Sequence, residues 1–172
     1  MSQTAASPSL PTIAFIGGGN MASAIIGGLI HQGLPASQIE VVEPWAEARE
    51  ALRKNYGIEA QAEAGPALQR AQIVVWAVKP QTFKDAAAQA KAHTQGALHL
   101  SVAAGIRSDS IAQWLGTERI VRTMPNTPAL VGKGMSALYA RPAVSAPERQ
   151  SIEAIMATTG EFLWVDSEPQ LD

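Results

Sequence analysis

Hydrophobic residues in this chain gather in short runs, separated by longer segments in which they recur at helical spacing. Several of the short runs are apolar on both faces and rich in β-branched side chains, which is typical of strands buried between two layers of helices. The runs predict strands at 12–16, 39–43, 73–78, 97–102, 119–123, 135–140 and 161–165.

The segments between the runs predict helices with recognisable ends. Segment 45–57 carries acidic residues near its start, basic residues near its end and Gly57 as its stop. Ser145 and Glu148 have the spacing of a capping box, and Ser108 is a candidate N-cap. The predicted helices span 20–31, 45–57, 81–93, 108–116 and 145–160.

This alternation predicts an α/β fold of the Rossmann type, a doubly wound and mostly parallel sheet with helices on both faces. A chain of 172 residues fits one such domain. We expect a flexible N-terminal tail at 1–11, the domain at 12–166, and the start of a connection to a further region at 167–172.

Composition narrows the possible partners. With 47% hydrophobic residues, 16% charged residues and a net charge of −2, the chain is typical of a globular protein without affinity for nucleic acid. No apolar run is long enough to span a membrane, and the N-terminus does not have the pattern of a signal peptide. The absence of cysteine fits a reducing compartment, so we expect a cytoplasmic protein.

Three glycines follow the first strand candidate directly and open the first helix. Residues Gly17 to Ala22 match G-x-G-x-x-A, in which the glycines permit a tight turn and close approach of a pyrophosphate, and the last small residue lets the helix pack near the sheet. Helix-start amides then face the phosphates. Although a plain tight turn can share this pattern, its context predicts a cofactor site at Ile16, Gly17, Gly18, Gly19, Asn20, Met21 and Ala22; Gly18 has no assigned role.

Glu43 ends the second strand candidate, 21 positions after Ala22, close to the spacing at which dinucleotide folds place an acid on the adenine ribose. Such an acid favours NADH, because each charge pair with a 2′-phosphate at about 5 Å costs roughly 1–2 kcal/mol. It does not exclude NADPH, since Arg49 lies one turn into the next helix. The alternative is an exposed carboxylate without a ligand.

Ligands of doubly wound sheets lie across the carboxyl ends of the strands. Three later strand exits carry small residues, which leave room for a flat ring, and two of them also carry prolines, which hold the backbone still. Asn126 lies between two prolines and suits a carboxamide such as that of nicotinamide. The exits add Ala77, Val78, Lys79, Pro80, Val102, Ala103, Ala104, Gly105, Met124, Pro125 and Asn126 to the candidate residues.

Five segments in order carry a specific resemblance: "IGGGNMASAIIGGL", "VVWAVKPQ", "SVAAGI", "RTMPNTPALVGKGMSALYA" and the final "LWVDSE". From about Ile13 onward the chain resembles the N-terminal dinucleotide-binding domain of the pyrroline-5-carboxylate reductases. The resemblance implies that Gly17 to Ala22 bind the pyrophosphate of NADPH or NADH, and that 77–80 and 102–105 line the cofactor cleft. It also implies that Met124, Pro125 and Asn126 lie near the nicotinamide and the substrate.

The family's reaction would be hydride transfer to the C=N carbon of 1-pyrroline-5-carboxylate, giving L-proline. Family members continue into a helical domain that dimerises and supplies loops to the substrate, so the resemblance implies a homo-oligomer for a full-length enzyme. It also implies that this chain by itself binds cofactor without turnover. No catalytic side chain is predicted here.

Two other functions stay open. One is a non-catalytic dinucleotide-binding module, and the other is a Rossmann dehydrogenase of the β-hydroxyacid type. We assign no role to the histidines: His31 and His93 fall near helix ends, and His99 fits a packed strand residue. No histidine and acid cluster has ligand spacing, so we predict no metal site.

Overall fold

The computed structural model describes residues 11–125 and 134–171. Its seven strands form one sheet in the order β3-β2-β4-β5-β6-β7-β8. Neighbouring strands run parallel except at β6 and β7, which are antiparallel. The predicted fold class is confirmed. The strands are β2 (Ile13–Ile16), β3 (Ile39–Val42), β4 (Ile73–Trp76), β5 (Leu98–Ser101), β6 (Ile120–Pro125), β7 (Gly134–Ala140) and β8 (Gly160–Trp164).

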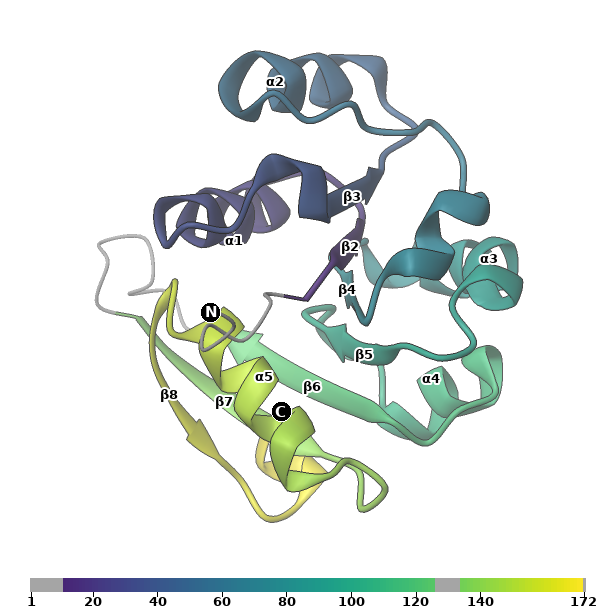
Figure 1. The fold of residues 1–172 in the computed structure, drawn as a ribbon. Coiled ribbons are helices and arrows are strands. Elements are labelled where there is room, and N and C mark those ends of the chain that lie inside the picture. Colours follow the sequence, from purple (N-terminus) through teal and green to yellow (C-terminus); the bar gives the residue numbers. More distant parts are fainter. Residues whose placement is uncertain (1–10, 126–133, 172) are drawn as a thin grey trace, which may run out of the picture.

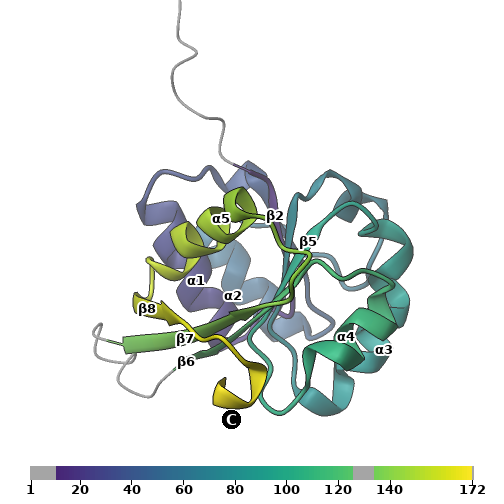
Figure 2. The same cartoon turned by 90° about the horizontal axis from the view of Figure 1, so that it is seen from below.

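Helices cover both faces of the sheet, as Figures 1 and 2 show. On one face lie α1, α2 and α5, and on the other lie α3 and α4. The α-helices are α1 (Asn20–His31), α2 (Ala46–Tyr56), α3 (Pro80–Ala90), α4 (Ser108–Leu115) and α5 (Ala146–Met156), and short 3₁₀ turns occur at Ala36–Gln38, Pro66–Arg70, Lys91–His93 and Glu168–Leu171.

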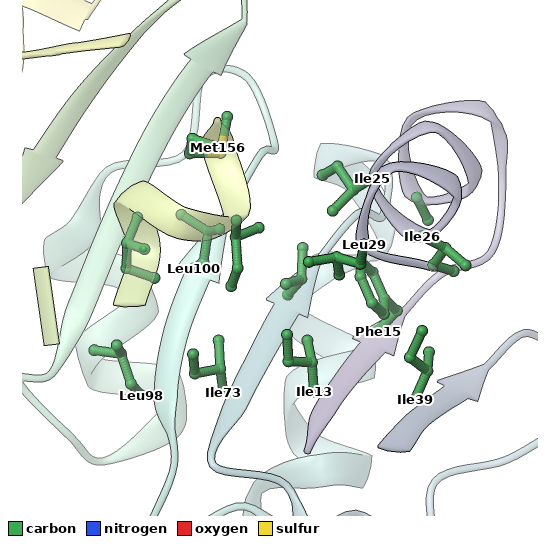
Figure 3. Close-up of a cluster of buried hydrophobic side chains, with 14 of the residues drawn as sticks. Ile13, Phe15, Ile25, Ile26, Leu29, Ile39, Ile73, Leu98, Leu100 and Met156 are labelled. Carbon is green, nitrogen blue, oxygen red and sulfur yellow. The ribbon is translucent and has the colours of Figure 1, made fainter. Parts of the chain in front are cut away.

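The central strands divide their side chains between two hydrophobic cores. In β2, Ile13 and Phe15 face α1, whereas Ala14 and Ile16 face α3 and α4. Figure 3 shows Phe15 in the first core, together with Ile26 and Leu29 of α1. All four β2 side chains are buried. Burial on both faces explains why these strands read as continuous apolar runs.

Several predicted element ends differ from the structure. Arg107, not Ser108, precedes the first turn of α4, because Ser108 bonds to Glu168. The helix predicted to close on Gly160 ends at Met156, and Gly160, with φ of 139°, starts β8. The capping box of α5 is confirmed: Ser145 Oγ accepts from the Glu148 amide, and the Glu148 carboxylate accepts from the Ser145 amide.

Residues 168–171 form the 3₁₀ turn η5, which packs against β7. Glu168 is 8% exposed and ion-pairs with Arg122 of β6, which is 1% exposed, at 2.8 Å. It also accepts hydrogen bonds from the backbone and side chain of Ser108. Leu171 is buried as well. The segment predicted to begin a connection therefore packs against the domain as far as Leu171.

No helix in the described ranges is long and apolar enough to cross a membrane.

Candidate dinucleotide-binding site

The predicted site residues gather at one edge of the sheet, because β3, β2, β4, β5 and β6 run parallel and share their carboxyl edge. Backbone hydrogen bonds continue from strand to strand into the exits. The Gly17 amide donates to the Val42 carbonyl at 2.8 Å, and the Ala77 amide donates to the Ile16 carbonyl at 2.9 Å. The exits after β2, β3 and β4 are thereby held side by side.

Gly17 and Gly19 meet different physical demands. Gly17 has φ of 101°, and a Cβ there would lie 2.4 Å from the Ala77 carbonyl oxygen, so only glycine fits. A Cβ on Gly19 would have no heavy atom within 4 Å. Gly17 is therefore required by the fold, whereas the bare backbone at Gly19 faces open space at the start of α1.

The start of α1 provides amides for an anion. Its N-cap, Gly19, has no side chain to bond them, and its first turn has no acidic residue. Ala22 is fully buried, which lets α1 lie close to the sheet, whereas Met21 is 38% exposed. Positive helix ends of this kind attract phosphates, so the residues present fit the pyrophosphate of a dinucleotide.

Gly18, which has no role in the sequence pattern, is explained by its neighbours. A Cβ at this position would lie 2.8 Å from Leu52 Cδ1 and 3.3 Å from the Glu43 Cβ. The Gly18 amide donates to Glu43 Oε1 at 2.8 Å, and the Trp45 amide donates to Glu43 Oε2 at the same distance. Glu43 therefore binds the glycine loop itself. Sequence reasoning missed Trp45, because nothing in its residue type signals a backbone contact.

The exits after β4 and β5 border the same edge with little side-chain bulk. Ala77 and Val78 are half-buried, and Lys79 is the exposed N-cap residue of α3. After β5, Gly105 turns the chain with φ of 78°, next to the exposed Ala104. The side chains of Ile16, Ala22 and Ala103 are buried in the cores, so these residues offer a ligand only their backbones.

Met124 and Pro125 end β6 at this edge, and the Met124 side chain is half-buried. Asn126, predicted to bind cofactor and substrate, lies outside the described residues. Of the three residues predicted to contact the substrate, the structure therefore describes Met124 and Pro125, at the end of β6.

His99 packs in the core beneath the site. It is 1% exposed, and its Nδ1 accepts a hydrogen bond from Trp76 Nε1 at 2.9 Å. Burial lowers the pKa of His99 to about 4, with a smaller contribution from Arg119, so the ring is neutral at physiological pH. The interpretation of His99 as a packed residue is confirmed. Among the described residues, no three His, Asp or Glu side chains are grouped to hold a metal ion.

Comparison with protein families agrees with this geometry. The family described as "NADP oxidoreductase coenzyme F420-dependent" matches residues 12–105, which include the glycine loop, Glu43 and the exits after β4 and β5. The chain belongs to this family.

Curated relatives of this NADP oxidoreductase family member are pyrroline-5-carboxylate reductases. The enzyme of Pseudomonas aeruginosa is 44% identical over 166 residues, which cover 95% of this chain and 61% of the relative. That of Haemophilus influenzae is 40% identical over 161 residues, which cover 92% of this chain and 59% of the relative. The predicted resemblance is confirmed, and the chain spans about three fifths of the length of these relatives.

The solved structures similar to this chain also include a pyrroline-5-carboxylate reductase. A pyrroline-5-carboxylate reductase from Coxiella burnetii is 34% identical, with a TM-score of 0.88 over 95% of this chain and 62% of that chain. A prephenate dehydrogenase from A. aeolicus is 15% identical with a TM-score of 0.78, a likeness of fold alone.

Proposed function

We propose that this chain is the cofactor-binding domain of a pyrroline-5-carboxylate reductase, which uses NADPH or NADH to reduce 1-pyrroline-5-carboxylate to L-proline. The observation that carries the proposal is the glycine loop. Gly17 is closed against Ala77, whereas Gly19 is open beside helix-start amides that have no side-chain cap. The similarity to the Pseudomonas aeruginosa reductase supports the choice of reaction.

The chemistry makes modest demands on side chains. When bound, the reduced nicotinamide supplies a hydride to the C=N carbon of the protonated imine; the C=N π electrons become the nitrogen lone pair, which leaves a secondary amine and oxidised cofactor. The residues of this chain then serve to position the reactants and exclude water. The α1 amides hold the pyrophosphate, and the small exits at Ala77 and Ala104 leave space for a planar ring.

The end of β6 is the proposed contact with the reactants. Met124 provides an apolar surface at the carboxyl edge, and the prolines at 125 and 128 restrict the backbone around Asn126, whose amide is the proposed partner of the nicotinamide carboxamide. The proton donor and the groups that bind the substrate carboxylate are assigned to the remaining two fifths of the relatives' length.

NAD(P)H absorbance tests the reaction. The substrate is 1-pyrroline-5-carboxylate, added to this chain and to a version extended to the length of its relatives. We expect turnover in the extended version only. If the cofactor binds without turnover in either version, the second candidate, a dinucleotide-binding module without catalysis, is favoured.

Gly19→Val tests the cofactor site separately. The added side chain enters the open space over Gly19 and blocks the phosphates, so we expect cofactor affinity in calorimetry to be lost while the thermal midpoint is retained. Unchanged affinity would remove the glycine loop from the site.

For the full-length enzyme we further propose a homo-oligomer in the cytoplasm with the imine as its small-molecule partner. The oligomer and its location rest on the family resemblance and on the absence of cysteine. Sedimentation of the extended version tests the oligomer.

A further inference from the structure

Glu43 is fixed by backbone contacts from three segments. Its amide donates to the Gln61 carbonyl at 2.7 Å, its Oε1 accepts from Gly18 at 2.8 Å, and its Oε2 accepts from Trp45 at 2.8 Å. The side chain is half-buried. The carboxylate therefore has one position, beside the second glycine of the loop and before the start of α2.

We propose that Glu43 makes this site selective for NADH over NADPH, an inference that rests on the proposed cofactor site. An acid at the end of the second strand of a dinucleotide fold meets the adenine ribose. Each carboxylate oxygen has two acceptor positions. Since one backbone amide occupies each oxygen, one position per oxygen is left for a ribose hydroxyl.

The Glu43 carboxylate can accept a hydrogen bond from a ribose hydroxyl, but it repels a 2′-phosphate. A ribose 2′-hydroxyl donates a hydrogen bond, whereas a phosphate monoester carries about −1.5 to −2 charges and presents acceptor oxygens. Glu43 has little freedom to turn away, because leaving its position breaks the contacts with Gly18 and Trp45. NADPH therefore binds against a fixed negative charge.

Arg49, the cation considered for a 2′-phosphate, is directed to the backbone instead. Its Nη1 donates to the carbonyl oxygens of Glu43 at 2.9 Å and Pro44 at 2.7 Å. These two bonds use both hydrogens of Nη1. A bidentate phosphate contact that pairs Nη1 with Nη2 would require one of these two carbonyl bonds to be given up.

Calorimetric titration of the chain with NADH and with NADPH tests the inference. We expect NADH to bind at least about tenfold more tightly, equivalent to about 1.4 kcal/mol. In Glu43→Gln the ratio of the two dissociation constants should fall below about threefold. Glu47→Gln, which removes an exposed carboxylate in the first turn of α2, should keep the wild-type ratio.

Arg49→Met provides an independent measurement. If Arg49 stays on the carbonyls, both cofactors change in affinity by the same factor. A selective loss of NADPH affinity in this variant would overturn the inference, as would equal affinities in the wild type, which can be read even if Glu43→Gln fails to fold. Equal affinities would leave the proposed function intact, whereas absence of binding by either cofactor would overturn both.

Discussion

Removing the buried carboxylate of Glu168 should destabilise the fold more than any surface change. Glu168→Ala removes the 2.8 Å ion pair with Arg122 and two hydrogen bonds from Ser108. Arg122, 1% exposed in the middle of β6, then loses its contact with Glu168. Breaking a buried pair by removing one member costs about 3–5 kcal/mol.

The lower end of that range is appropriate, because Arg122 takes part in a further interaction besides the one with Glu168. We therefore expect a loss of about 3 kcal/mol in unfolding free energy, or roughly 6–12 °C in thermal midpoint for a chain of this size. Urea unfolding followed by circular dichroism measures the first quantity, and calorimetry measures the second. Glu161→Gln, a change at an exposed position of β8, is the control and should stay within about 0.5 kcal/mol of wild type.

The pH dependence gives a second readout of the same contacts. Burial raises the pKa of Glu168, but hydrogen bonds from Ser108 and Arg122 outweigh it, and the pKa lies below its usual value of 4.5. Because the folded state holds the carboxylate ionised, this stabilisation is present above pH 4.5 and is lost as the pH falls through the lower, folded pKa. If the unfolding free energy of Glu168→Ala at neutral pH lies within about 0.5 kcal/mol of the wild-type value, the reasoning about the buried pair is refuted.

Three further predictions concern single residues. The pKa of His99 is about 4 in the fold and 6.5 in the unfolded chain. The unfolded state therefore binds the proton first, and the unfolding free energy should fall by about 3 kcal/mol as the pH falls from 6.5 to 4. In His99→Gln, the urea midpoint should decline less across this range. Gly17→Ala should lower the thermal midpoint sharply, because its Cβ would meet a carbonyl at 2.4 Å, whereas an equal midpoint for Gly17→Ala and Gly19→Ala would contradict the packing argument. Ser145→Ala should cost about 1 kcal/mol in urea unfolding through loss of the Glu148 capping box, and no loss would show that the cap is energetically idle.

Two positions of the glycine loop were predictable because each obeys a local rule. A turn that demands positive φ at Gly17 and a bare backbone at Gly19 both appear in the sequence as glycine. The role of Gly18 was not predictable, because it depends on Leu52 and Glu43, which the fold brings from other elements. The exact start of α4 was missed for the same reason: Ser108 has the right chemistry for an N-cap, but Glu168, 60 residues later in the chain, engages it.

Hydrophobic periodicity and turn chemistry are local properties, so the sequence alone determined the number of strands, their order along the chain, the doubly wound architecture and the glycine loop, and it predicted the edge of the sheet at which we propose a ligand. Which polar groups meet across that edge depends on contacts between residues distant in the chain. Only the tertiary structure decided that Glu43 is fixed by the amides of Gly18 and Trp45, that Arg49 bonds to carbonyls, and that Arg122 is neutralised by Glu168. Hydrogen bonds and ion pairs are directional and short-ranged, and no pattern along the chain encodes which partners the fold brings within reach.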